Sequence, residues 1–114
     1  MKELTGRDSL TPILFGAAAF QYMNSACELG LFDLLNQKLS GLTKKDIAAT
    51  IKLEQRAIDV LLLGTTALKL TKKENELYSN CQAITQLFKD NMWETFKDIV
   101  AFEQYIVYKG QFDF

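Results

Sequence analysis

The sequence of 114 residues contains no histidine, and several classes of active site are excluded by that absence. A serine–histidine–aspartate triad, a zinc site with imidazole ligands and an acid–base step on histidine all need this residue. No glycine-rich loop follows a predicted strand, because the run Gly16-Ala-Ala-Ala falls inside a predicted helix. The carboxylates are scattered, and Asp33 is expected on the outward face of a short helix. We therefore expect no catalytic residue, no nucleotide-type cofactor site and no metal site in this chain.

Cysteine is also scarce, and charge of one sign is not in excess. Cys27 and Cys81 lie far apart and fit no metal-binding spacing, so we expect two buried thiols in a reducing compartment. Thirteen Lys and Arg stand against fourteen Asp and Glu, which gives a net charge of -1 and no general attraction to nucleic acid or anionic membranes. The first ten residues lack the apolar core of a signal peptide, and no apolar run reaches the ~20 residues of a membrane span. These features predict a soluble, cytoplasmic protein that binds no membrane.

The pattern that is present is helical almost throughout. The single proline, Pro12, predicts a helix start with Thr11 as N-cap, and Gly30 predicts its end. Thr43 and Asp46 resemble a capping box at the start of another helix. We expect helices over about 11–29, 31–36, 44–51, 54–68, 81–88 (capped by Ser79 or Asn80) and 92–108, with a hairpin of strands 70–73 and 76–79 before the fifth helix.

This order predicts a mainly α fold. A short helix, a tight turn and a longer helix form a helix-turn-helix, and a hairpin directly after them makes the winged version. The expected architecture is a single winged helix-turn-helix domain over residues 1–114, with extra helices at both ends.

A winged helix-turn-helix can bind DNA, and the second of its helices would then lie in the major groove. The predicted helix 54–68 carries one arginine against two carboxylates, and the wing over 69–76 carries three lysines against two carboxylates. A DNA-binding protein neutralises several phosphates, for which this surface has too little positive charge. We expect no nucleic-acid partner, and a DNA-binding transcription regulator remains the alternative function.

The first and last predicted helices are apolar on almost every side, which a domain of this size can hardly enclose. Either the protein is a monomer with an unusually apolar surface, or the two helices form a large obligate interface. We expect the second, an intertwined homodimer. The predicted interface residues are Leu10, Leu14, Ala18, Tyr22, Trp93, Phe96 and Phe102.

Several segments resemble one known family. Residues 25–35 read Ser-Ala-Cys-Glu-Leu-Gly-Leu-Phe-Asp-Leu-Leu, similar to the "A-x-E-L-G-L-F-D-x-L" signature of the N-terminal dimerisation domain of S-adenosylmethionine-dependent O-methyltransferases, the plant caffeate-type and bacterial polyketide-tailoring enzymes. Residues 42–48 resemble the family's "L-T-x-x-E-L-A", and residues 76–79 resemble its wing strand. Residues 56–62 resemble its "R-x-L-x-R-L-L-R" helix, although Asp59 stands where a basic residue is common. Trp93 and the pair Lys97-Asp98 resemble the helix before the catalytic domain.

The resemblance implies a dimerisation and substrate-lid module of a small-molecule O-methyltransferase. In the family, S-adenosylmethionine and the catalytic histidine belong to a Rossmann-like domain that follows this module, and we expect that domain to be absent from this chain. The family's first helix also reaches the partner's active site. By this resemblance, Phe15 is the position expected to contact the methyl acceptor in trans, with Ala19 one turn away and Met92 as a further candidate.

Overall fold

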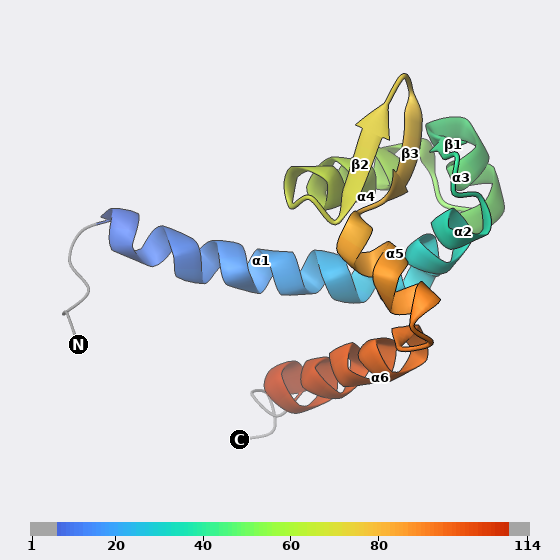
Figure 1. Ribbon diagram of the computed structural model, residues 1–114. Helices are drawn as coiled ribbons and strands as arrows, with labels where there is room; N and C mark the ends of the chain where they lie inside the picture. Colours follow the sequence, from blue (N-terminus) through green and yellow to red (C-terminus); the bar gives the residue numbers. More distant parts are fainter. Residues whose placement is uncertain (1–6, 110–114) are drawn as a thin grey trace.

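The computed structural model describes the backbone of residues 7–109 and the side chains of residues 16–106. Helices account for most of this part, and three short strands form one sheet (Figure 1). The elements are α1 (Arg7–Leu29), α2 (Leu31–Gln37), β1 (Leu42–Thr43), α3 (Lys44–Ile51), α4 (Gln55–Ala67), β2 (Thr71–Glu74), β3 (Leu77–Asn80), α5 (Gln82–Lys89), α6 (Trp93–Glu103) and the π-helix η1 (Gln104–Lys109).

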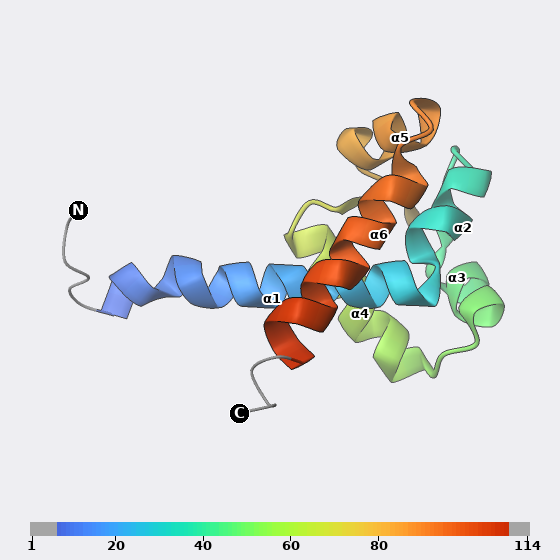
Figure 2. The same ribbon diagram turned by 90° about the horizontal axis from the view of Figure 1, so that it is seen from below.

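The longest helix, α1, sets the shape of the molecule. Its C-terminal half lies against the other elements, while its N-terminal half extends away from them (Figure 1). Viewed from below, α6 crosses α1 on one side and α4 lies on the other (Figure 2). The molecule measures 45 × 29 × 28 Å along its principal axes. The central part of α1 therefore lies between α4 and α6.

Helices α3 and α4 with the hairpin β2–β3 form the predicted winged helix-turn-helix. The sheet has the order β1-β3-β2, and both pairings are antiparallel. β1 was not expected, because its two residues lie where the sequence predicts a loop and a helix cap. Thr43 takes both roles: it pairs with Leu77 in the sheet, and its hydroxyl accepts a hydrogen bond from the backbone N–H of Asp46 at 3.2 Å. Thr43 is thus confirmed as the N-cap of α3, and the wing is tied to the start of this helix.

The structure corrects several predicted boundaries. α1 begins at Arg7, so Pro12 lies inside the helix rather than at its first position. Each strand of the hairpin lies one residue later than expected, because the residues with positive φ at the turn are Asn75 and Glu76. The N-cap of α5 is Cys81, and its side chain makes no capping bond. Asn80 instead belongs to β3.

The side chain of Asn80 also differs from expectation, because it does not cap a helix. The side-chain amide of Asn80 donates to the carbonyl of Phe32 at 2.9 Å, which ties the wing to α2. Because the Asn80 side chain bonds to this distant carbonyl, it cannot cap the neighbouring helix α5, and local spacing in the sequence does not encode such a bond.

The last predicted helix also differs from expectation. The predicted helix 92–108 is an α-helix only as far as Glu103 and continues as the π-helix η1.

The core is centred on Phe32 and Trp93, which join α2 to α6. Trp93 is 3% exposed, stacks on Phe88 with ring centroids 4.6 Å apart, and meets Phe32 edge-on at 5.5 Å. Its indole N–H donates to Asp33 Oδ1 at 3.0 Å. The expectation that Asp33 faces outward is therefore wrong: the residue is half-buried, and its carboxylate satisfies the one polar atom of a buried tryptophan.

Candidate interaction surfaces

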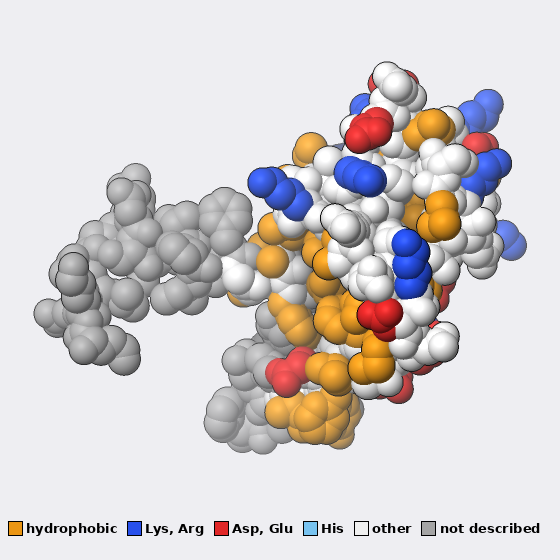
Figure 3. All heavy atoms as spheres, in the orientation of Figure 1, with side chains coloured by type: hydrophobic (Ala, Val, Ile, Leu, Met, Phe, Trp, Pro, Cys, Tyr) orange, Lys and Arg blue, Asp and Glu red, His pale blue; other side chains and the backbone are white. Residues whose placement is uncertain are grey.

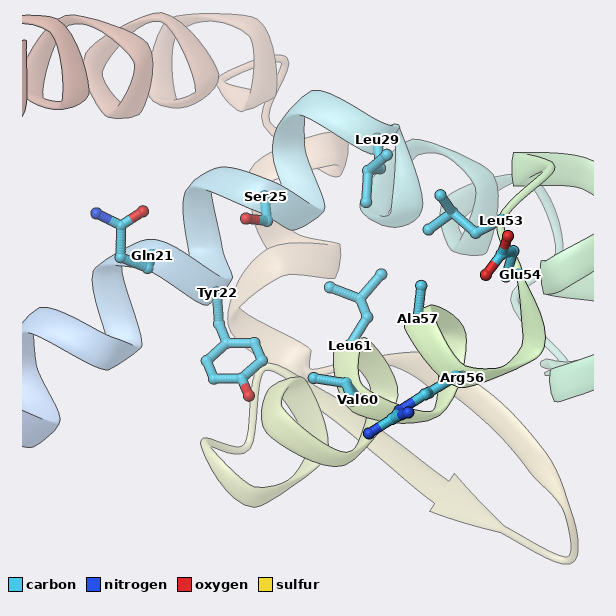
Figure 4. Close-up of a pocket in the computed structure, with 10 residues that line it drawn as sticks. All are labelled: Gln21, Tyr22, Ser25, Leu29, Leu53, Glu54, Arg56, Ala57, Val60 and Leu61. Atoms are coloured by element: carbon cyan, nitrogen blue, oxygen red, sulfur yellow. The ribbon is translucent and has the colours of Figure 1, made fainter.

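Two apolar grooves flank α1, one on each side. The larger, which we call the α1–α4 groove, has a volume of about 690 Å³. Ala57 and Leu61 point from α4 toward α1, and Tyr22 and Leu29 extend from α1 (Figure 4). Glu54 and Gln21 lie at opposite ends of the groove. The groove is lined by Gln21, Tyr22, Ser25, Leu29, Leu53, Glu54, Arg56, Ala57, Val60 and Leu61.

A close approach between α1 and α4 closes one side of this groove. The ring of Tyr22 lies directly over Gly64, where a Cβ atom would overlap Cε1 and Cζ of the ring. Only glycine lets the tyrosine lie this near to the axis of α4. Tyr22, a predicted interface residue, is therefore half-buried in its own chain and presents only part of its surface to the groove.

The second groove, the α1–α6 groove, has a volume of about 440 Å³ and lies on the opposite side of α1. Glu103 is the one charged residue in its lining. Ala19 and Phe96, predicted from the sequence as a substrate-contact residue and an interface residue, both line it. The groove is lined by Gly16, Ala19, Phe20, Met23, Leu68, Leu70, Phe96, Ile99, Val100 and Glu103.

An exposed apolar stripe runs along α6 into η1 beside this second groove. Its members are each more than half exposed, and hydrophobic side chains gather over α6 at the lower edge of Figure 3. Phe102, a predicted interface residue, is 63% exposed. We call this surface the α6 stripe, and it consists of Ile99, Phe102, Tyr105 and Ile106.

The remaining predicted residues are distributed unevenly. Trp93 is buried within the chain and leaves almost no surface for a partner. Met92 is 48% exposed at the start of α6, eleven positions before Glu103, and lines neither groove. Ala18 is exposed on α1. Leu10, Leu14 and Phe15 belong to the helix, but their side chains lie outside the described residues.

The outer face of α4 is apolar where a DNA-reading helix would be polar. Val60 is 52% exposed and Leu63 is 74% exposed. The charge pattern of this helix gives no sign of either exposed residue. The sequence does carry a signal for this exposed apolar face. Three apolar residues of α4 face inward, namely Ile58, Leu61 and Leu62, and the helix has more apolar residues than these.

Two lysines near this face, Lys44 and Lys73, form ion pairs. Lys44 Nζ lies 2.9 Å from Asp59 Oδ1, and Lys73 Nζ lies 3.6 Å from Glu76 Oε2. Hydrogen bonds from Lys44 and then from Gln55 hold the pKa of Asp59 below its usual value. Lysines that already face carboxylates are poorly placed for phosphate contacts.

Comparisons with known proteins identify the family to which this winged-helix fold belongs. A family model described as the O-methyltransferase dimerisation domain matches residues 12–89. The chain belongs to this family.

Two relatives place the dimerisation domain within longer proteins. The chain is 50% identical over 107 residues to L-tyrosine C(3)-methyltransferase of Streptomyces lavendulae, covering 94% of this chain and 29% of that protein. It is also similar to the solved apo form of the S-adenosylmethionine-dependent methyltransferase SibL, at 42% identity and a TM-score of 0.82, covering 93% of this chain and 30% of that one. The chain thus spans about 30% of the length of these relatives. Both are methyltransferases and neither is a transcription regulator, so the alternative function finds no support here.

The described part of the dimerisation domain lacks the features of several other kinds of site. Among the side chains of residues 16–106, no three of His, Cys, Asp or Glu come together in a way that could hold a metal ion. No helix of the described part is long and apolar enough to cross a membrane. Its sheet is antiparallel throughout, whereas the S-adenosylmethionine site of a Rossmann-like fold needs a parallel strand followed by a glycine-rich turn. The described residues therefore do not fit this cofactor.

The two thiols of the dimerisation domain differ in environment. Cys27 is buried, as expected, whereas Cys81 is only half-buried. Burial, followed by the negative charge of Asp33, raises the pKa of Cys27 to about 11. A thiol with this pKa is protonated at neutral pH and behaves as a small apolar core residue.

Proposed function

We propose that this dimerisation domain forms a homodimer and belongs to an S-adenosylmethionine-dependent methyltransferase that acts on a small molecule. The observation that carries the dimer is the α6 stripe. Four large apolar side chains, each more than half exposed and next to one another along α6 and η1, form a surface that soluble monomers rarely leave open. A second copy of the chain would cover it, with α1 and α6 as the main contributors.

The dimer is tested by charge substitution on the stripe, measured by multi-angle light scattering over a range of protein concentrations. The unaltered chain should have twice its mass of 13.0 kDa. Phe102→Asp should raise the dimer dissociation constant about tenfold or more, because a carboxylate would have to be buried between two apolar faces.

The matched control is Leu39→Asp. Leu39 is 64% exposed, almost as much as Phe102, but lies in the loop between α2 and β1. This variant should dimerise as the unaltered chain does. A folded 13.0 kDa monomer for the unaltered chain, at concentrations well above micromolar, would overturn the proposed dimer.

The substrate contact belongs to the same proposal. Ala19 lines the α1–α6 groove, and Phe15 precedes it by one helical turn on α1. The aromatic rings of Phe20 and Phe96 in this groove suit a flat acceptor, and the relative from Streptomyces lavendulae acts on tyrosine. We therefore propose that the protein containing this chain also methylates an aromatic acceptor. Met92, at the start of α6, would be a further contact to it.

In the full-length protein, Phe15→Ala should raise the Michaelis constant for the acceptor several-fold, because a stacking surface is lost. Dimer stability and the affinity for S-adenosylmethionine should stay nearly unchanged. If the substitution dissociates the dimer and leaves acceptor binding per dimer unaltered, Phe15 is an interface residue only.

The cofactor and the chemical step lie outside this chain in our proposal. S-adenosylmethionine would be held by a Rossmann-like catalytic domain in the rest of the protein, as the relatives' greater length supports. Residues 1–114 would then form one winged-helix domain that joins two subunits and closes over the acceptor. Its cytoplasmic location stays a prediction.

A further inference from the structure

The α1–α6 groove has a single charged group in an otherwise apolar lining. Its residues from α6 share one face of that helix, and they are Phe96, Ile99, Val100 and Glu103. The lining contains no lysine and no arginine, so no cation of the chain lies in the groove beside Glu103. The volume of about 440 Å³ is typical of pockets that hold small molecules. The carboxylate of Glu103 therefore decides which charge a bound molecule can carry there.

The aromatic part and the acidic part of the groove lie at different places along α6. Phe96 stacks on the buried Trp93 with ring centroids 5.8 Å apart, which holds the ring of Phe96 in place. Glu103 follows seven residues later, about 10 Å further along the helix. On α1, a Cβ atom at Gly16 would meet nothing within 4 Å, so the opposite wall leaves open space. A flat ring on Phe96 with a short side chain can therefore reach toward the carboxylate.

A molecule that covers Glu103 removes water from a negative charge, and the cost of this step depends on what replaces the water. A neutral molecule replaces it with nothing, which leaves the carboxylate poorly solvated. A molecule with its own carboxylate adds repulsion. An ammonium group instead makes charge-assisted hydrogen bonds to the carboxylate oxygens, which are stronger than bonds between neutral groups. The groove therefore favours a cationic aromatic molecule over its neutral and anionic analogues.

We infer that the methyl acceptor is an aromatic compound that carries an ammonium group, and that Glu103 selects it by pairing with this group. The inference rests on the proposed function, which puts an aromatic acceptor at this groove, and it adds the charge of the acceptor and the residue that recognises it. Glu103 holds the end of the acceptor that is not methylated. It is a specificity residue and takes no part in the chemical step.

The first test gives the full-length protein three phenols that differ only at the end of a two-carbon chain. The probes are tyramine with an ammonium group, 4-ethylphenol with no charge and 3-(4-hydroxyphenyl)propanoate with a carboxylate. Methyl transfer from S-adenosylmethionine to each probe is measured by mass spectrometry. The ratio kcat/KM should be highest for tyramine, by about tenfold or more over 4-ethylphenol, and lowest for the propanoate.

The second test changes the charge at the groove. Glu103→Gln should lower the preference for tyramine over 4-ethylphenol about five- to tenfold, and the loss should appear in KM more than in kcat. Glu103→Lys should reverse the order, so that the propanoate is preferred over tyramine. Glu103 is exposed in the single chain, so neither change should unfold it, which far-ultraviolet circular dichroism checks.

The matched control is Glu94→Gln on the same helix. Glu94 pairs with Lys97 and lines neither groove, so this variant should keep the preference within about twofold. Light scattering on each variant confirms that the subunits associate as they do without the substitution.

The outcomes separate this inference from the proposed function. If phenols are methylated without a preference for tyramine, or if the preference survives both substitutions at Glu103, the inference is overturned while the aromatic acceptor stands. A preference that Glu94→Gln abolishes as strongly as Glu103→Gln also overturns it, because general surface charge then explains the selection. If the unaltered protein methylates no aromatic compound, the aromatic acceptor of the proposed function is wrong, and the inference falls with it.

Discussion

Gly64→Ala should destabilise the dimerisation domain by about 1–2 kcal/mol, although alanine is the better helix former. The new Cβ atom would overlap the ring of Tyr22, so either the ring must leave its place or α1 and α4 must separate. Overpacking of this kind costs about 1–3 kcal/mol, and the gain in helix propensity offsets about 1 kcal/mol at most. The measurement is urea-induced unfolding at a fixed protein concentration.

Gly16 offers a matched control on α1. A Cβ atom there meets nothing within 4 Å, so Gly16→Ala should stabilise the domain by about 0.5–1 kcal/mol through helix propensity alone. In a background carrying Tyr22→Ala, the substitution at Gly64 should lose its cost. If Gly64→Ala raises stability in the unaltered background, the tyrosine does not hold the two helices in this arrangement.

Trp93→Ala should cost about 3–5 kcal/mol of the free energy of unfolding. The side chain is 3% exposed and lies between Phe32, Phe88 and Phe96 where α2, α5 and α6 meet. Its loss leaves a large cavity and removes the donor that satisfies Asp33. Small domains have about 5–15 kcal/mol in total, so the variant should be largely unfolded at moderate denaturant concentration.

Two milder changes separate packing from hydrogen bonding. Trp93→Phe keeps an aromatic ring and loses the N–H, so it should cost distinctly less than alanine. Asp33→Asn keeps an oxygen acceptor for the indole, and its cost should be smaller again. A loss below about 1 kcal/mol for Trp93→Ala would contradict the central position of this residue in the core.

The helical part of the fold was predictable because its signals are local. The apolar periodicity of α4 and the hydroxyl of Thr43 before α3 act within a few residues, and both were found where expected. The strand β1 was missed because it has two residues and pairs with a segment more than thirty positions away. The bond from Asn80 to Phe32 depends on tertiary contact in the same way.

The candidate surfaces were predictable only in part. Excess apolar residues on the first and last helices correctly indicated surfaces that the single chain leaves open, including Phe102. Composition could not tell Phe102 from Trp93, since both are aromatic residues of α6 and only their position around the helix separates exposure from burial. Asp33 was placed outside because its partner, the indole of Trp93, lies sixty residues further along the chain.

The order β1-β3-β2 also decides how this protein avoids uncontrolled aggregation. An open sheet presents two unpaired edges, each a template for adding a strand from another molecule. Here one edge is β1, only two residues long, and the other is β2, where Lys72, Lys73 and Glu74 carry charge. Short and charged edge strands resist such addition, which leaves the exposed apolar faces of the helices as the surfaces for the proposed contact with a second copy.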